Sequence, residues 1–395
     1  MPHLPSLRQA ALQGRRVFAR VDFNVPVEGE LITDDRRIRA ALPTIEYLLA
    51  QGAGVILCSH FGRPKAGVPD PRYSLQVVRR HLENLLQRPV GWIADPFTPF
   101  PVAPGTVYLM ENIRFFSGET ENDPHLAQAL AAWAEVYVND AFGTLHRAHA
   151  SVDALPRLFR EKYAGFLVEA EWQNAQRVLY TIERPYLLIV GGAKVSDKLP
   201  LLKHLLPRAD RVLIGGGMSY TFLKAEGRPV GRSLVEADQL EAARDFLAQA
   251  RQQGKTIGLP VDAVAAEAFS AEAVPHIFSH EPGAFPETYM GLDIGPATIE
   301  LARRLIQGSR TILWNGPMGV FEWPAFRAGT QAVAEAVAAE TTQHGAYSLI
   351  GGGDTAAAVE MAGVADQVSF VSTGGGALLE LLAGQTLPGI AALLA

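Results

Sequence analysis

Charged and polar groups follow apolar runs in the first half of the chain. They are Asp22 and Asn24 in RVDFNVP, His60 and Arg63 in SHFGRP, Arg114 in MENIRF and Arg147 in FGTLHRAHAS. Arg37 lies in TDDRRIRAALPTIEYLL, which predicts a helix capped near Thr33 or Asp34. Arginine makes bidentate contacts with phosphate and carboxylate groups, so the pattern predicts a cradle for a small ligand that carries both. Zinc is the weaker interpretation, because the spacing of His146 and His149 comes without Cys or Glu partners.

Glycines take the same place in the second half. The clusters are Gly191–Gly192, Gly215–Gly217, Gly351–Gly353 and Gly374–Gly376, together with Asn315–Gly316–Pro317. Glycine lets the backbone approach a ligand closely, and a helix that starts there attracts phosphate. The pattern therefore predicts a nucleotide site, although neither a Walker A loop nor a protein kinase's motif set is present.

Charged and amide side chains accompany these glycines. In VGGAKVSDKLPLL, Pro200 is expected in the first turn of a helix, which would place Lys198 at the helix start, where a cation is favourable only beside a bound anion. Two surface lysines, Lys194 and Lys198, are the alternative. In GGGDTAAAVEMAG, Asp354 is expected as an N-cap or as a ligand of Mg²⁺. Asn315 and Glu322, in WNGPMGVFEWPAF, are expected in a loop.

Short β-branched runs alternate with longer helical patterns along the whole chain, which is typical of βαβ units and parallel sheets. The predicted strands are 17–21, 55–58, 107–110, 136–138, 187–190, 212–214, 256–259, 311–314, 348–350 and 368–371. Ligands of open α/β sheets bind outside the carboxyl ends of the strands, so each half is expected to carry its own site. A helical stretch near 169–184, ending at Pro185, is expected to connect the halves.

Composition narrows the class of protein. The 395 residues include 35 basic and 41 acidic side chains, a net charge of −6, so binding of nucleic acid by bulk electrostatics is not expected. The single cysteine, Cys58, excludes internal disulfides and suggests a reducing compartment. No apolar run approaches the ~20 residues of a membrane span. The chain is expected to be soluble and cytoplasmic.

The order of these motifs resembles that of the phosphoglycerate kinase family. RVDFNVP, ITDDRRIRAALPTI, SHFGRP, MENIRF, VNDAFGTLHRAHAS, GGAKVSDK, GGGM, WNGPMGVFEW, GGGDT and STGGGA follow one another over roughly residues 15 to 380. Phe61 and Leu145 depart from the family's usual leucine and alanine, beside the polar positions. The resemblance implies phosphoryl transfer between 1,3-bisphosphoglycerate and ADP, giving 3-phosphoglycerate and MgATP in glycolysis.

The resemblance also assigns roles to residues. The triose-phosphate cradle would be Asp22, Asn24, Arg37, His60, Phe61, Gly62, Arg63, Arg114, His146 and Arg147. The nucleotide side would be Gly192, Ala193, Lys194, Lys198, Gly217, Gly291, Asn315, Glu322, Gly352, Gly353, Asp354 and Thr355. Glu322 would meet the ribose hydroxyls, and Asp354 would help to hold the nucleotide's Mg²⁺. The catalytic groups would be Arg37, Lys198 and the backbone of Gly374, Gly375 and Gly376.

The implied architecture is two doubly wound, Rossmann-like α/β domains joined by a helical hinge. Residues 1–170 would bind 3-phosphoglycerate, 171–184 would connect, 185–378 would bind ATP or ADP, and 379–395 would pack back on the first domain. Transfer would be direct and in line, without a phosphoenzyme or a general base. A monomer is expected. A nicotinamide-dependent oxidoreductase and a non-enzymatic two-lobed anion-binding protein are the alternatives.

Overall fold

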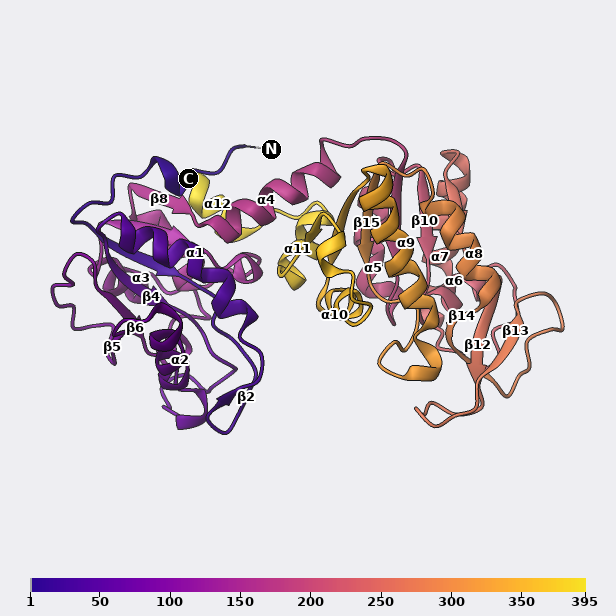
Figure 1. Ribbon diagram of the computed structural model, residues 1–395, viewed down its shortest axis with the longest axis horizontal. Helices are drawn as coiled ribbons and strands as arrows, with labels where there is room; N and C mark the ends of the chain where they lie inside the picture. Colours follow the sequence, from indigo (N-terminus) through magenta and orange to yellow (C-terminus); the bar gives the residue numbers. More distant parts are fainter. Residues whose placement is uncertain (1) are drawn as a thin grey trace. The chain divides into compact units, whose positions relative to one another are not determined.

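The computed structural model describes residues 2–395, which form two compact units (Figure 1). Unit 1 comprises the chain up to Gln173 together with Thr386–Ala395, and unit 2 comprises Asn174–Gln385. Both ends of the described chain therefore belong to unit 1. Among residues 2–395, no helix has the length and apolar character needed to cross a membrane.

Unit 1 is built on a six-stranded sheet in which every pair of neighbours is parallel, in the order β5-β6-β4-β1-β7-β8. The strands are β1 Arg16–Arg20, β4 Gly54–Cys58, β5 Gly91–Ile93, β6 Val107–Met110, β7 Val136–Asn139 and β8 Glu161–Ala164. Every residue of β4 is buried, as expected for a central parallel strand covered on both faces. The principal helices are α1 Arg36–Ala50, α2 Gln76–Leu86 and α3 Pro124–Ala131, and a small hairpin pairs β2 Val27–Glu28 with β3 Leu31–Ile32.

Unit 2 has a second parallel six-stranded sheet, in the order β11-β10-β9-β15-β16-β17. The strands are β9 Tyr186–Val190, β10 Arg211–Ile214, β11 Thr256–Gly258, β15 Thr311–Asn315, β16 Tyr347–Gly351 and β17 Phe370–Val371. The helices are α5 Val195–Leu205, α6 Ser219–Ala225, α7 Leu240–Gln252, α8 Pro296–Ile306, α9 Ala328–His344, α10 Gly353–Met361 and α11 Gly375–Leu382. The strand order reverses between β9 and β15, which makes the carboxyl ends of these two strands the expected ligand crevice. The predicted doubly wound α/β class is confirmed.

A small antiparallel sheet in unit 2 was not predicted. It has the order β13-β12-β14, from β12 Asp262–Ala266, β13 His276–Ser279 and β14 Met290–Ile294. The sequence of β12, DAVAA, contains three alanines and one β-branched residue, so its composition does not favour a strand. Strand β12 is held by its pairing with β14, and the helices α8 and α9 pack against these two strands. These contacts form only in the tertiary structure.

The helix α4, Phe166–Leu179, ends earlier than predicted. The chain then leaves the helical path because Glu183 is tied to β15: the Glu183 N–H donates to Thr311 Oγ1 at 3.1 Å, and that hydroxyl donates to the Glu183 carbonyl at 2.7 Å. The unit boundary lies inside α4, between Gln173 and Asn174. At the far end, unit 2 continues to Gln385, beyond the expected residue 378.

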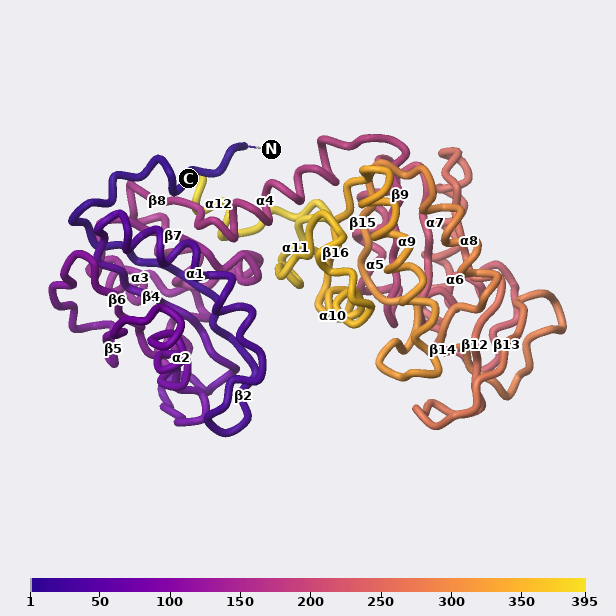
Figure 2. The backbone as a smooth tube through the Cα atoms, in the orientation of Figure 1, coloured from indigo at the N-terminus to yellow at the C-terminus, as the bar shows by residue number. Residues whose placement is uncertain are grey.

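The final helix, α12 Pro388–Leu394, belongs to unit 1 and packs beside β8 and the turn of Ala150–Ala154 (Figures 1 and 2). The Gly389 N–H donates to the Leu145 carbonyl at 2.9 Å. A β-carbon at Gly389 would lie 2.4 Å from Leu145 Cδ2, so the helix can approach this closely only because the residue is glycine. The unusual Leu145 is therefore part of the docking surface of α12.

Two neighbouring leucines of α12 test this docking. Leu393 is 2% exposed and Leu394 is 39% exposed. We expect Leu393→Ala to lower the free energy of unfolding by about 2–5 kcal/mol, the usual cost of removing a buried leucine side chain. Leu394→Ala, the matched control, should change it by less than about 1 kcal/mol. Urea unfolding followed by circular dichroism measures both, and equal effects of the two substitutions would contradict the docking described here.

Candidate functional sites

Unit 1 gathers its predicted polar residues at the carboxyl edge of the sheet. Asp22 and Asn24 follow β1, His60 follows β4, Arg114 follows β6, and Arg147 follows β7. These are the ends that a parallel sheet brings to one edge.

Hydrogen bonds link several of these segments directly. Arg37, from α1, donates through Nη1 to the Asn24 carbonyl at 3.0 Å and lies 3.3 Å from Asp22 Oδ2. The Asn24 side-chain oxygen accepts from the Gly62 N–H at 2.8 Å, and the Gly62 carbonyl accepts from Arg114 Nη1 at 2.7 Å. The structure therefore brings the predicted cradle residues of α1, β1, β4 and β6 together.

The cluster carries more positive charge than its protein neighbours neutralise. Burial, together with the nearby charges of Arg147, Arg20 and Arg63 and against the opposing effect of Glu119, lowers the pKa of Arg114 to about 10. Arg114 Nε is buried and has no hydrogen-bond partner among the described residues. An anion bound here would relieve the repulsion and give that donor a partner.

Two histidines of this cluster, His60 and His149, are held neutral. Burial lowers the pKa of His60 well below its usual 6.5, and Arg20 and Arg114 lower it further. His60 Nδ1 lies 3.3 Å from Arg20 Nη2, which can only donate, so this ring nitrogen is the acceptor. Burial, followed by Arg114 and Arg20, lowers the pKa of His149 to about 4. An imidazole with a strongly lowered pKa is a weak base, so these histidines fit an orienting role better than proton transfer.

A buried support for this cluster was missed in the sequence. Arg20 is 1% exposed, and its Nε donates to Ser151 Oγ at 2.8 Å. The buried Glu119 accepts from the Ser151 hydroxyl at 2.6 Å and from the Ser151 N–H at 2.9 Å. An arginine inside the apolar run RVFAR was the one available signal. Its partner Ser151 lies 131 residues farther along the chain, a separation that sequence spacing cannot reveal.

The remaining cradle residues divide into supporting and exposed groups. Phe61 is buried, its N–H donates to Asn112 Oδ1 at 3.0 Å, and its carbonyl accepts from Asn112 Nδ2 at 2.6 Å, so it anchors the loop after β4. His146 Nε2 accepts from Arg147 Nε at 3.3 Å. Arg63 is exposed, and its charge acts on Arg114.

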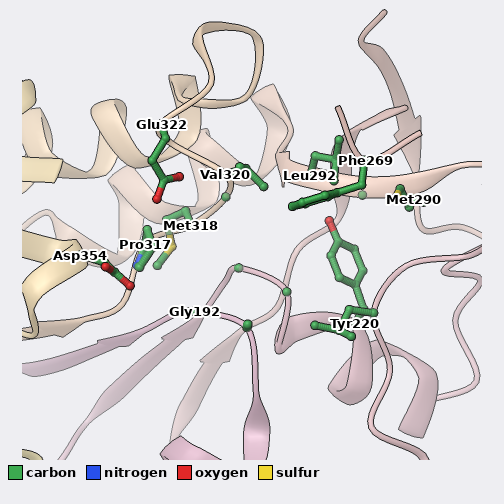
Figure 3. Close-up of a pocket in the computed structure, with 16 residues that line it drawn as sticks. Gly192, Tyr220, Phe269, Met290, Leu292, Pro317, Met318, Val320, Glu322 and Asp354 are labelled. Carbon is green, nitrogen blue, oxygen red and sulfur yellow. The ribbon is translucent and has the colours of Figure 1, made fainter. Parts of the chain in front are cut away.

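Unit 2 has a pocket of about 320 Å³ at the carboxyl edge of its sheet (Figure 3). Among the predicted nucleotide residues, those that line it are Gly192, Ala193, Gly217, Gly291, Glu322 and Asp354. Figure 3 shows Glu322 and Asp354 on one side and an apolar group on the other. The sequence missed that apolar group, which consists of Tyr220, Leu234, Phe269, Met290, Leu292 and Val320. Several of these come from the unpredicted antiparallel sheet and its loops.

Lys198 and Asn315 meet beside this pocket. The lysine Nζ donates to Asn315 Oδ1. Burial lowers the pKa of Lys198, while the carboxylates of Asp197 and Asp354 oppose that shift. Asn315 is the fully buried last residue of β15, so its expected place in a loop is wrong, and its Nδ2 has no partner among the described residues.

The predicted cap at Asp354 is also wrong. Helix α10 begins at Gly353 with Gly352 as its N-cap, and no side chain within residues 2–395 caps it. The Asp354 carboxylate is exposed instead and lines the pocket, while the buried Thr355 accepts from the Gly316 N–H at 2.7 Å. A single exposed carboxylate suits Mg²⁺ that arrives with phosphate oxygens and water as its other ligands. No group of three potential metal-binding side chains occurs within residues 2–395.

Helix α5 starts at Val195, so Pro200 is its sixth residue and not part of its first turn. The expectation failed because the glycine turn ends sooner than assumed, with Lys194 as the N-cap. Lys198 nevertheless remains in the first turn. Lys194 is exposed, whereas Lys198 is partly buried.

The glycines serve two different purposes. A β-carbon at Gly191 would lie 2.1 Å from the Pro317 carbonyl oxygen, and one at Gly291 would lie 1.9 Å from the Tyr220 hydroxyl, so both are required by neighbouring protein atoms. Gly353 and Gly375 face open space at the starts of α10 and α11. The sequence predicted that the backbone approaches a ligand at every glycine cluster. The structure leaves room for that approach best at the starts of α10 and α11.

Comparisons with known proteins give one result. The family model of phosphoglycerate kinase matches residues 7–385. The phosphoglycerate kinase of Thermosynechococcus vestitus is 50% identical over 394 residues, covering 98% of this chain and 97% of the relative. The chloroplastic enzyme of Volvox carteri is 47% identical, covering 98% and 85%. The solved structure of phosphoglycerate kinase from Coxiella burnetii has a TM-score of 0.93 at 40% identity, with 99% of both chains covered, and that from Pyrococcus horikoshii has 0.84 at 32%, with 99% and 98% covered.

The neutral histidines give a pH prediction. His149 should titrate near pH 4 in the folded chain and near its usual 6.5 in the unfolded chain. The unfolded state then binds more protons between these values, so His149 makes stability rise with pH from about 4 to 6.5. Imidazole resonances followed by NMR give the titrations directly. A midpoint near 6.5 for His149 or His60 in the folded chain would contradict the electrostatics described for this cluster.

Proposed function

Because the chain belongs to the phosphoglycerate kinase family, we propose that unit 1 binds 3-phosphoglycerate and that unit 2 binds the magnesium nucleotide. The chain's activity is reversible phosphoryl transfer from 1,3-bisphosphoglycerate to ADP, which yields 3-phosphoglycerate and ATP in glycolysis. The oxidoreductase and the non-enzymatic binding protein are set aside by this membership. What remains to be assigned is the part that each residue plays.

The observation that carries the assignment of unit 1 is its uncompensated positive charge. Burial, together with the charges of Arg147 and Arg20, lowers the pKa of the half-buried Arg114, whose Nε has no hydrogen-bond partner within residues 2–395. A phosphorylated carboxylic acid supplies the anionic oxygens that such a cluster lacks. The proposed contacts are made by Asp22, Asn24, Arg37, His60, Gly62, Arg63, Arg114, His146 and Arg147, with Phe61 holding the loop.

The pocket of unit 2 suits a nucleotide because its two ends differ. The apolar end, with Leu234 and Phe269, fits a base, and Glu322 is proposed to accept from the ribose hydroxyls. The phosphates are proposed to lie toward Lys198 and the start of α10. The full proposed set is Gly192, Ala193, Lys194, Lys198, Gly217, Gly291, Asn315, Glu322, Gly352, Gly353, Asp354 and Thr355.

Asp354 is the residue proposed to hold Mg²⁺ with the nucleotide, because its carboxylate is exposed and is not used to cap helix α10. When bound, the ion would neutralise phosphate charge. The residues of this chain then have to orient the nucleotide and to exclude water.

Direct, in-line transfer requires little beyond position and charge. The attacking oxygen is already ionised at neutral pH, so no residue has to remove a proton, in agreement with the lowered pKa of His60, which makes it a weak base. We assign Arg37 and Lys198 to the oxygens of the migrating group, with the N–H groups of Gly375 and Gly376 as further donors. The N–H of Gly374, the third expected donor, already donates to Ser372 Oγ at 3.0 Å. Hinge closure, a cytoplasmic location and a monomeric state stay predictions; one relative is named as chloroplastic.

Alanine substitutions test the charge assignment. Lys198→Ala and Arg37→Ala should each lower kcat by roughly 10²–10³-fold, the scale for losing one preorganised stabilising group. Lys203→Ala, exposed on the same helix as Lys198, and Arg39→Ala, exposed on α1, are matched controls and should stay within about twofold. ADP formation from ATP and 3-phosphoglycerate, coupled to an optical readout, measures kcat. Losses below tenfold at both Arg37 and Lys198 would refute their roles.

A further inference from the structure

The start of α5, expected from the sequence to attract a nucleotide phosphate, already holds an anion of the protein. The carboxylate of Glu236 accepts from the Val195 N–H and, at 3.3 Å, from the Ser196 N–H, while the Ser196 hydroxyl donates to its other oxygen at 2.6 Å. A carboxylate at this end satisfies donors that have no partner within the helix and is favoured by the helix dipole. Glu236 reaches it from 40 residues farther along the chain.

The segment that ends at Glu236 also forms part of the nucleotide pocket. Leu234 lines the apolar end of that pocket, and the Ser233 hydroxyl accepts at 2.9 Å from the N–H of Gly291, another lining residue. The Glu236 N–H donates to the buried Thr221 Oγ1 of α6 at 3.1 Å. The segment is thus fixed to the pocket at one end and to α5 at the other.

Helix α5 carries the phosphate side of the same pocket. Gly192 and Ala193, which line the pocket, precede its first residue, and Lys198 lies in its first turn against Asn315. The starts of α10 and α11 differ, because their N-caps are Gly352 and Gly374 and no side chain of the described part of the chain caps either helix. Their first residues, Gly353 and Gly375, face open space where a phosphate can approach, whereas the N–H groups of Val195 and Ser196 donate to Glu236.

We propose that Glu236 is a positioning residue of the nucleotide site, an inference that rests on the nucleotide assignment of unit 2. Its carboxylate takes the place of a phosphate at α5 and fixes Ala193 and Lys198 relative to the wall formed by Leu234. The nucleotide's phosphates therefore bind at Lys198 and the open helix starts, and not at the amides of Val195 and Ser196. This one side chain therefore fixes the position of the base end of the pocket relative to its phosphate end.

The proposal is tested by whether substitution of Glu236 weakens or tightens the binding of MgADP. Calorimetric titration of the full chain with MgADP should show about tenfold weaker binding for Glu236→Ala, the scale of losing a charged hydrogen bond. Glu236→Gln should lose less, because its amide oxygen still accepts from a backbone N–H. Binding of 3-phosphoglycerate should stay unchanged in both. Glu241→Ala, exposed on the first turn of α7, is the matched control and should bind MgADP like the wild type.

Tighter binding by Glu236→Ala would mean that the carboxylate competes with a phosphate for α5, which overturns the proposal. Unchanged MgADP binding with a lower melting temperature would reduce Glu236 to a structural cap and also overturn it. If Glu236→Ala does not fold, Glu236→Gln and Ser196→Ala give the same test, with weaker MgADP binding expected for each. If the wild type binds no MgADP, the nucleotide assignment of unit 2 is overturned. If the wild type binds MgADP and the Glu236 variants bind it equally well, only this inference is overturned.

Discussion

Parallel strands place all their carboxyl ends on one edge of a sheet, and both six-stranded sheets of this chain are parallel throughout. In unit 1 that constraint brings Asp22, His60 and Arg114 together from strands that lie dozens of residues apart in sequence. In unit 2 it brings the turn after β9 beside the turn after β15, where the strand order reverses. The positive cluster and the nucleotide pocket are both consequences of this one arrangement.

The same constraint explains why the sheets were predictable from the sequence. Buried parallel strands such as β4, GVILC, are continuous apolar runs, and such runs stand out between helical patterns. The antiparallel sheet was missed because β12 consists mostly of alanine and its pairing with β14 is set by distant packing. The end of α4 was placed too late because the bonds between Glu183 and Thr311 join positions 128 residues apart.

Charged strand ends were predictable, but their partners were not. Arg114 and Lys198 could be proposed from type and position, whereas the support of Arg20 by Ser151 and the contact of Lys198 with Asn315 depend on chain segments that meet only after folding. Glu236 shows the limit most clearly. Its sequence neighbourhood carries no signal for a cap on a helix 40 residues earlier. Glycine clusters were a mixed guide, since some positions admit a ligand and others only admit neighbouring backbone.

The central claim, that each unit binds its own ligand through the carboxyl edge of its sheet, can be measured by hydrogen–deuterium exchange on the full chain. With 3-phosphoglycerate alone, exchange should slow in residues 20–24, 59–63, 112–115 and 144–150. With MgADP alone, it should slow in residues 191–198, 290–292, 315–322 and 352–356. Protection of the same unit by both ligands, or of the opposite edges of the sheets, would contradict the account.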